Sequence, residues 1–240
     1  MLSVIIPAYN EESSIAKTLE IVAGVFPEKE IIVINDASQD KTGAILEEFK
    51  SKIDGFPLLK EYRFVNKSIN AGKGAAIRTA LPLVKGNIVL IQDADLELDP
   101  REYVKLLEPF EKLNADIVFG SRFRREGIVT VHRLWHLLVN KILTGFSNIM
   151  SGLYITDMET GYKVFRREVI LSFNLRSDRF GIEPEFAAKT AKAVKKNNLN
   201  FYEVAVSYHP RSRKQGKKIN WWDGVKALFL IFYFNLFEDA

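Results

Sequence analysis

The 240-residue sequence contains no cysteine, which excludes a disulfide scaffold, a Cys-liganded zinc site, an iron–sulfur cluster and a thiol nucleophile. Its three histidines, His132, His136 and His209, form no metal-binding pattern, because no H-E-x-x-H surrounds the first two. A G-x-S-x-G elbow is also missing, which argues against a serine hydrolase. The candidate chemistry is therefore that of carboxylates and cations.

Long apolar runs are also lacking. No run reaches the roughly 18 residues that a membrane span needs, and the nearest approach is 227–237. The chain starts with MLSVIIPAYN, without a basic segment before a long apolar stretch, so we expect no signal peptide. The net charge of +4 is too small to predict nucleic-acid binding. We expect a protein with neither a membrane span nor a nucleic-acid partner.

The charges that are present are unevenly distributed. Residues 211–218 read RSRKQGKK, with five cations and no acid. Four acids gather in 93–99, at Asp93, Asp95, Glu97 and Asp99. A basic segment and an acidic cluster in one chain indicate an anionic ligand and a divalent cation, and two solvated faces are the alternative.

Short apolar runs alternate with helical patterns through the first half of the chain. The runs lie at 2–6, 30–34, 62–65, 87–91 and 116–119, and the helical patterns at 11–22, 40–49, 73–84 and 100–113. Ser38 is expected to cap the second of these helices. The later segments predict helices at 133–150, 167–173 and 185–196, strands at 162–165 and 201–206, and a terminal helix. The alternation predicts a single α/β domain over 1–240, with a mostly parallel sheet covered by helices on both faces.

In such sheets ligands bind beyond the carboxyl ends of the strands. The segments that follow the predicted strands are polar or turn-forming, and several are of ligand-binding type. They are PAYNE at 7–11, NDAS at 35–38, NAGKG at 70–74, DAD at 93–95 and GSR at 120–122.

Asp93-Ala94-Asp95 is the sharpest of these features. Side chains two apart on an extended backbone point the same way, and two adjacent carboxylates favour a cation between or near them. Mg²⁺ or Mn²⁺ held by one or two carboxylates plus substrate phosphates fits that need. The alternative is a turn or helix cap before Pro100.

The NAGKG segment at 70–74 opens a helix, where backbone N–H groups attract phosphate and Lys73 adds charge. It matches neither the Walker A pattern nor the dinucleotide fingerprint, because Ile77 stands where the third glycine would be. Phosphate binding and a simple left-handed turn are both open for this loop.

Seven motifs occur in one order along the chain: PAYNE, NDAS, NAGKG, DAD, GSR, DMETGYKVF at 157–165 and RSRKQGKK. In this combination the sequence closely resembles family 2 glycosyltransferases of the GT-A fold, which is Rossmann-like. Within that family it is similar to the dolichyl- or polyprenyl-phosphate mannose and glucose synthases. The resemblance covers about residues 2–225.

The resemblance implies a nucleotide-sugar pocket. Pro7, Tyr9 and Glu11 would line it. Asp36 would accept a hydrogen bond from a base ring N–H, and Lys73 would lie near the base and ribose. Uracil and guanine both offer such an N–H, so GDP-mannose and UDP-glucose both stay open as the donor.

The resemblance also implies a metal and an acceptor site. Asp93 would bind ribose or sugar, and Asp95 would bind Mg²⁺ or Mn²⁺. Glu97 would be a further metal ligand, at a position where relatives often carry Gln. Arg122 and Arg133 would hold the acceptor phosphate.

Further roles are implied for the second half of the chain. Arg211 and Lys218 would close on the diphosphate. Asp157 would orient the nucleophile or the sugar, or be a turn residue, and it completes the expected catalytic set with Asp93, Asp95 and Arg122. Glu183 and Glu185 would reach the sugar, or Glu185 would cap a helix.

These roles imply metal-dependent transfer of mannose or glucose to a polyprenyl or dolichyl phosphate, with inversion. A phosphate monoester is largely dianionic at pH 7 and attacks without a general base, whereas a hydroxyl acceptor needs one. The alternatives are a family 2 transferase acting on a glycan or other soluble hydroxyl acceptor, and a non-catalytic nucleotide-binding or membrane-docking module. The oligomeric state is open.

An enzyme that uses a lipid acceptor must act at the surface of a bilayer. Residues 221–237 begin with Trp221-Trp222, are apolar nearly all round, and as a helix are too short to span a bilayer. We expect this segment to be a membrane-interface helix, and packing on the sheet or on a second subunit is the alternative. The stretch 134–155 is the next candidate. The expected location is peripheral, on the cytoplasmic face of a membrane.

Overall fold

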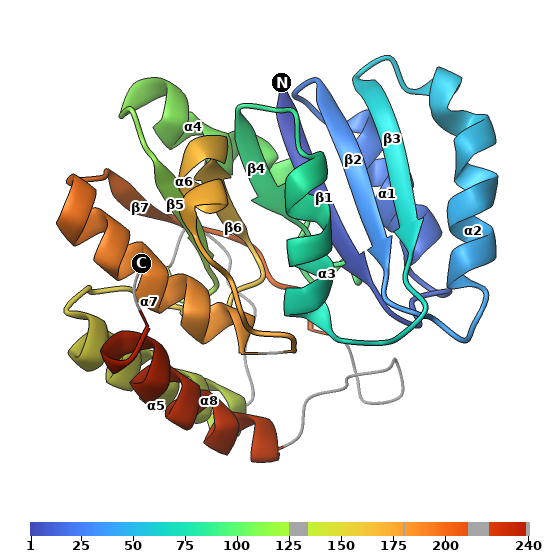
Figure 1. Ribbon diagram of the computed structural model, residues 1–240. Coiled ribbons are helices and arrows are strands. Elements are labelled where there is room, and N and C mark those ends of the chain that lie inside the picture. The colour runs from blue at the N-terminus through green and yellow to red at the C-terminus, as the bar shows by residue number, and fades with distance from the viewer. Residues whose placement is uncertain (125–133, 180, 211–220, 239–240) are drawn as a thin grey trace.

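The computed structural model describes residues 1–124, 134–179, 181–210 and 221–238 (Figure 1). In these residues seven strands form one sheet, in the order β3-β2-β1-β4-β6-β5-β7. The strands are β1 (Leu2–Ala8), β2 (Lys29–Asn35), β3 (Leu59–Asn66), β4 (Ile88–Ile91), β5 (Ile117–Ser121), β6 (Lys163–Arg166) and β7 (Phe201–Ala205). The helices are α1 (Ile15–Gly24), α2 (Thr42–Phe49), α3 (Lys73–Ala80), α4 (Tyr103–Lys112), α5 (Leu134–Ser151), α6 (Arg167–Ser172), α7 (Ile182–Asn197) and α8 (Trp221–Leu236).

The sheet is parallel except at β6, as the prediction of a mostly parallel sheet required. β6 runs antiparallel between β4 and β5, with Lys163 opposite both Ile91 and Phe119. The start of β6 therefore lies at the edge where β4 and β5 end. The residues that precede β6 share that edge with the residues that follow the parallel strands.

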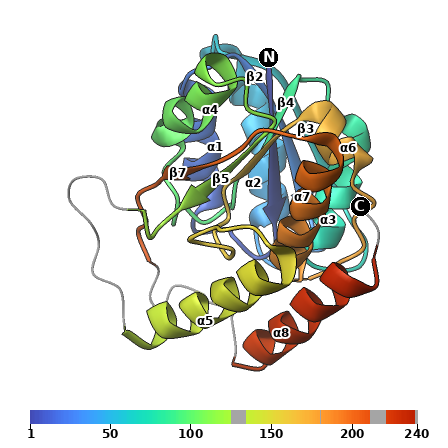
Figure 2. The same cartoon turned by 90° about the vertical axis from the view of Figure 1, so that its left-hand side faces the viewer.

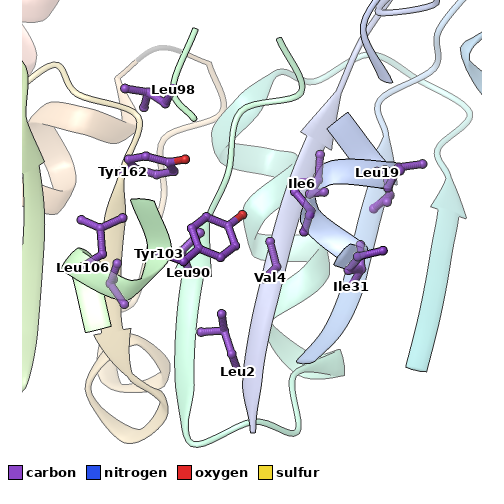
Figure 3. Packing of buried hydrophobic residues seen from close by; sticks show 14 of the residues in the cluster. Leu2, Val4, Ile6, Leu19, Ile31, Leu90, Leu98, Tyr103, Leu106 and Tyr162 are labelled. Atoms are coloured by element: carbon purple, nitrogen blue, oxygen red, sulfur yellow. The ribbon is translucent and has the colours of Figure 1, made fainter. Parts of the chain in front are cut away.

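Helices cover both faces of the sheet, and each face has its own core. Along β1 the side chains alternate, so that Val4 and Ile6 join one cluster and Ile5 joins the other. The first cluster, part of which Figure 3 shows, packs under α1, α2 and α4. The second packs under α3, α6 and α7. Each fully buried aliphatic side chain contributes about 1.5–3 kcal/mol to these cores.

α5 and α8 form a third packing unit, which lies below the sheet in Figures 1 and 2. Ala227, Ile231 and Phe234 of α8 are buried against α5 and α7. The spacing of these three residues places them on one face of the helix. The sequence predicted that this segment lies in a membrane interface or packs on the sheet or on a second subunit. In the structure one face of α8 packs on α5 and α7 rather than on the sheet. Of the helices described, none has the length and apolarity to cross a bilayer.

Element boundaries differ from the predictions where side chains compete for the backbone. The helix predicted from residue 40 begins at Thr42, whose N–H donates to Asp40. Ser38 does not cap it, because its hydroxyl accepts the backbone N–H of Asn10. The helix predicted over 73–84 ends at Ala80 and continues as a short 3₁₀ turn, Leu81–Leu83, which contains Pro82.

Candidate active site

The loops that follow the parallel strands contain backbone conformations that side chains rarely adopt. Asn10, Ala37 and Leu96, which follow β1, β2 and β4, have φ angles of 51°, 61° and 57°. Non-glycine residues in the left-handed region carry a local cost, and such residues cluster at functional sites. Three of these loops at one edge of the sheet mark that edge as the candidate site.

Asp36 fastens the NAGKG loop to the end of β2. Its buried carboxylate accepts hydrogen bonds from the backbone N–H groups of Ala71 and Gly72 and from Lys67 Nζ, at 2.5 Å for the lysine. Asn70 Nδ2 donates to the Asp36 carbonyl at 3.1 Å. The predicted contact between Asp36 and a base remains a prediction, and in the structure both carboxylate oxygens already bind this loop.

Lys73, at the start of α3, joins two parts of the site. Its Nζ lies 2.7 Å from Asp93 Oδ1 and 2.8 Å from Glu183 Oε1. Burial alone would lower the pKa of Lys73, but the two carboxylates outweigh burial and hold the pKa above its usual value. The lysine is therefore a fixed cation beside the first aspartate of the DAD motif.

Gly161 packs directly against the Asp93 carboxylate. A Cβ added to Gly161 would lie 2.0 Å from Asp93 Oδ2. The backbone of Asp93 is held from below by Gln92, whose Nε2 donates to the Asp93 carbonyl at 2.9 Å. Gln92 Oε1 in turn accepts the hydroxyls of Tyr103 and Tyr162, both visible in Figure 3. The backbone at Asp93 is thus held by the core beneath it.

Arg122, directly after β5, is held by Asp157. The Asp157 carboxylate accepts bonds from the Arg122 Nε at 2.7 Å, from a terminal nitrogen at 2.8 Å and from the backbone N–H at 3.0 Å. Burial alone would raise the pKa of Asp157, but the guanidinium holds it below its usual value. The guanidinium also lies 5.1 Å from the centroid of the Tyr208 ring. Asp157 therefore positions the arginine.

The segment that carries Asp157 is anchored to β7. Glu203 accepts the backbone N–H groups of Thr156 at 2.8 Å and of Asp157 at 3.3 Å. Its side chain is almost fully buried. A buried carboxylate with several donors is a rigid support, so the Arg122–Asp157 pair is held from two strands.

Asp95 and Glu97 lie in the turn that Leu96 makes. The Glu97 N–H donates to Asp95 Oδ1 at 3.0 Å, and the Tyr208 hydroxyl donates to Glu97 Oε2 at 3.0 Å. Within the described residues no group of three or more His, Cys, Asp or Glu side chains could hold a metal ion. Two carboxylates fit a Mg²⁺ or Mn²⁺ ion that takes its remaining ligands from substrate phosphates and water.

Two further ionisable groups, Glu159 and Lys163, are buried between the Lys73–Asp93 pair and the Arg122–Asp157 pair. Burial, and next the Glu183 carboxylate, raise the pKa of Glu159 to about 7. Burial lowers the pKa of Lys163 to about 8, although nearby carboxylates oppose it. Lys163 Nζ donates to the carbonyls of Met158 and Thr160 at 3.2 and 2.5 Å, and so shapes the turn before β6.

The structure describes some of the other predicted site residues and not others. Pro7 and Tyr9 are half-buried at the end of β1, and Glu11 is buried with its carboxylate accepting the Ser14 hydroxyl at 2.8 Å. Arg133, Arg211 and Lys218 lie outside the described residues. The sequence did not single out Glu159, Tyr208 or Gly161 for a role of its own. Tyr208 follows β7, so the strand-end rule that found Arg122 could have found it.

The family pattern that matches, over residues 3–172, is described as glycosyl transferase family 2. A dolichyl-phosphate beta-glucosyltransferase of Trichomonas vaginalis is 30% identical over 227 residues, 87% of this chain and 65% of that protein. A polyprenol monophosphomannose synthase of Mycolicibacterium smegmatis is 31% identical over 175 residues, 72% of this chain and 64% of that protein. The chain thus spans just under two thirds of both relatives.

One solved structure shares the fold over nearly the whole chain. It is glucosyl-3-phosphoglycerate synthase from Mycobacterium tuberculosis in complex with UDP, with a TM-score of 0.68 and 19% identity, covering 98% of this chain and 79% of that one. A second structure of that enzyme contains Mn²⁺, UDP-glucose and phosphoglyceric acid. At this identity the likeness establishes the fold.

Proposed function

Because the chain belongs to glycosyl transferase family 2, we propose that it transfers a hexose, mannose or glucose, from a nucleotide-diphosphate sugar to a polyprenyl or dolichyl phosphate. The observation that carries this proposal is an arginine fixed at the same edge of the sheet as the two aspartates of the DAD motif. Arg122 is fixed by Asp157 on the edge of the sheet where Asp93 and Asp95 lie.

The donor half of the proposal uses the DAD motif. Asp95 and Glu97 would hold Mg²⁺ or Mn²⁺, which would neutralise the diphosphate of the donor. Asp93 and Lys73 would lie at the ribose or sugar, and Pro7, Tyr9, Glu11 and Asp36 would form the base pocket. Arg211 and Lys218 would contact the diphosphate. Support for the metal comes from two carboxylate side chains, Asp95 and Glu97, in one turn, and from the Mn²⁺ in the structure of the Mycobacterium tuberculosis enzyme.

The acceptor half uses Arg122, with Arg133 as a second cation. A phosphate oxygen of the acceptor attacks the anomeric carbon from the side opposite the leaving group. The bond from that carbon to the donor diphosphate breaks, and nucleoside diphosphate leaves, so that the configuration inverts. The dianionic nucleophile needs cationic positioning rather than a base, and Arg122 supplies a cation that its two-point bond to Asp157 holds in place.

The named activities of the relatives favour a lipid phosphate as the acceptor. One relative acts on dolichyl phosphate by its name and another makes polyprenol monophosphomannose. The neighbour from Mycobacterium tuberculosis is named for 3-phosphoglycerate, which also carries a phosphate. All three names refer to a phosphorylated acceptor. The experiment must determine whether the phosphate of the acceptor is attached to a lipid chain or to a small soluble molecule.

A lipid acceptor requires contact with a membrane, and we propose that this contact is peripheral and on the cytoplasmic face; the exposed faces of α5 and α8 support a peripheral contact. Phe229, Tyr233 and Phe237 stack at successive i, i+4 positions, with centroids 6.3 and 6.2 Å apart. Phe229 and Phe237 are 66% and 69% exposed. Ile142 and Ile149 of α5 are also exposed. Exposed aromatic and aliphatic side chains on neighbouring helices suit the lipid interface. The predicted anchors Trp221 and Trp222 have no described side chains.

The test is a donor panel. Radiolabelled GDP-mannose and UDP-glucose are each incubated with a short polyprenyl phosphate, with and without Mn²⁺. Label that enters organic solvent in a metal-dependent manner is the expected result. Label transferred from the donor to a new water-soluble product when 3-phosphoglycerate or a sugar replaces the lipid would favour the alternative, a transferase for soluble acceptors.

A further inference from the structure

Two carboxylate oxygens in the candidate site have no hydrogen-bond partner among the described residues. They are Oε1 of Glu159 and Oε2 of Glu183, and both atoms are buried. The Glu183 side chain is only 8% exposed. A buried acceptor without a donor carries a free-energy cost, and such groups are rare in folded proteins. Two of them in one site indicate that a ligand supplies the donors.

The two carboxyl groups lie between the donor side and the acceptor side of the site. Glu183, in the first turn of α7, uses its other oxygen to bind Lys73, which also binds Asp93. Glu159 is in the short segment between Asp157, which holds Arg122, and Gly161, which packs on Asp93. Under the function proposed above, this region would lie between the nucleotide and the attacking phosphate, where the transferred hexose would bind.

The charges around Glu159 favour a neutral donor. Glu183 and Asp157 face it as acids, and Arg122 and Lys163 face it as cations, while its own pKa is raised to about 7. A further anion would be repelled by the carboxylates. Hexose hydroxyl groups donate hydrogen bonds without adding charge, and several are present on each ring.

We propose that Glu159 and Glu183 accept hydrogen bonds from hydroxyl groups of the donor hexose and thereby select which hexose is bound. This inference rests on the function proposed above. The DMETGYK motif then has three tasks in sequence: Asp157 positions Arg122, Glu159 contacts the sugar, and Gly161 leaves room for Asp93.

Glu185 provides the matched control. It lies two residues from Glu183 on α7 and is fully buried. Its two oxygens accept the backbone N–H groups of Arg176 and Ser177, each at 2.7 Å. The sequence predicted sugar contacts for Glu183 and Glu185, with a helix cap as the alternative for Glu185; in the structure the Glu185 carboxylate binds backbone N–H groups of the protein itself.

The experiment measures binding without any acceptor. Isothermal titration with Mn²⁺ compares UDP-glucose with UDP, and GDP-mannose with GDP, for the wild type and for Glu159→Gln, Glu183→Gln and Glu185→Gln. We expect Glu159→Gln and Glu183→Gln each to weaken the nucleotide sugar about 10- to 100-fold and to change the bare nucleotide less than twofold. Glu185→Gln should lower the melting temperature and leave the sugar-to-nucleotide affinity ratio unchanged.

A second measurement identifies the contact. Donors that lack one hydroxyl at a time should bind the wild type more weakly at the contacted position. In Glu159→Gln or Glu183→Gln that position should no longer matter. Parallel loss of nucleotide and nucleotide-sugar affinity, or unchanged affinity for both, would overturn this inference while the proposed function stands. If the wild type binds neither nucleotide nor nucleotide sugar, the proposed function fails and this inference fails with it.

Discussion

Replacing Gly161 by alanine tests whether the position of Asp93 matters for transfer independently of the fold. The added Cβ would lie 2.0 Å from Asp93 Oδ2. Ordinary van der Waals contact begins at 3.4 Å, so the carboxylate must retreat by about 1.4 Å. Gly161 has no positive φ angle, so the alanine itself adds no backbone strain.

This displacement of the Asp93 carboxylate should lower the transfer rate strongly and the free energy of unfolding only slightly. Asp93 would lose its 2.7 Å contact with Lys73 Nζ, and a misplacement of about 1 Å in a site can cost 100-fold in rate. The Asp93 side chain is 28% exposed and can move toward solvent, so we expect a stability loss of about 1–2 kcal/mol. For a chain of this size that corresponds to about 2–8 °C in melting temperature.

The control is Gly74→Ala. Its Cβ would also lie 2.0 Å from its nearest atom, but that atom is the Ser177 carbonyl oxygen, which is backbone. Here a loop or the start of α3 must move, so we expect a stability loss of about 3 kcal/mol or more.

The assay pairs transfer rate with thermal melting for both variants. Gly161→Ala should keep most of its stability and lose about 100-fold in kcat/KM, and Gly74→Ala should show the larger drop in melting temperature. A Gly161→Ala variant with wild-type kcat/KM would refute the reasoning, because Asp93 would then tolerate displacement. A Gly161→Ala variant that melts as early as Gly74→Ala would refute the claim that the cost falls on a movable side chain.

Three further predictions follow from single features. Asp95→Asn should lower transfer at saturating donor about 100-fold or more with little change in melting temperature, because an amide binds a hard cation poorly; full activity would reject the metal assignment. Burial lowers the pKa of Lys29 from 10.5 to about 8, so between these pH values the unfolded state binds more protons than the folded state, and the stability of the wild type rises with pH. In urea titrations the stability of Lys29→Met relative to wild type should therefore fall by about 3 kcal/mol from pH 8 to 10.5, and a difference that stays constant would contradict this. Replacing both exposed residues, Phe229→Ser and Phe237→Ser, should weaken binding to anionic vesicles in a flotation assay about 30-fold or more without changing the melting temperature. The buried-residue variant Phe234→Ala should lose about 3–5 kcal/mol in stability and still float, and equal flotation of all variants would exclude α8 as the anchor.

Much of the molecule is determined by local sequence signals. The apolar runs of β1 and β2 are short, continuous and ended by polar turns, so they predict buried parallel strands without any knowledge of partners. The rule that ligands gather at the carboxyl ends of such strands selected Asp93, Asp95 and Arg122. These predictions depend on the backbone direction and the burial of each strand, which nearby residues fix.

Tertiary structure decided which of these residues meet. β6 is inserted antiparallel between β4 and β5, and strand order and direction depend on long-range pairing that a short run such as Lys163–Arg166 does not encode. This insertion brings Asp157 to Arg122, 35 residues away, and Gly161 to Asp93. The bond from Lys73 on α3 to Glu183 on α7 joins residues 110 apart and likewise depends on contacts between distant parts of the chain.

The terminal helix shows the same division. Its composition is apolar nearly all round, so the sequence alone could not say which side would be buried. Packing on α5 and α7 buries Ala227, Ile231 and Phe234 and leaves Phe229 and Phe237 exposed. Composition is a local property, and it set how apolar the helix is. The buried face depends on the shape of the neighbouring helices, and that shape exists only once residues distant in the sequence have come together.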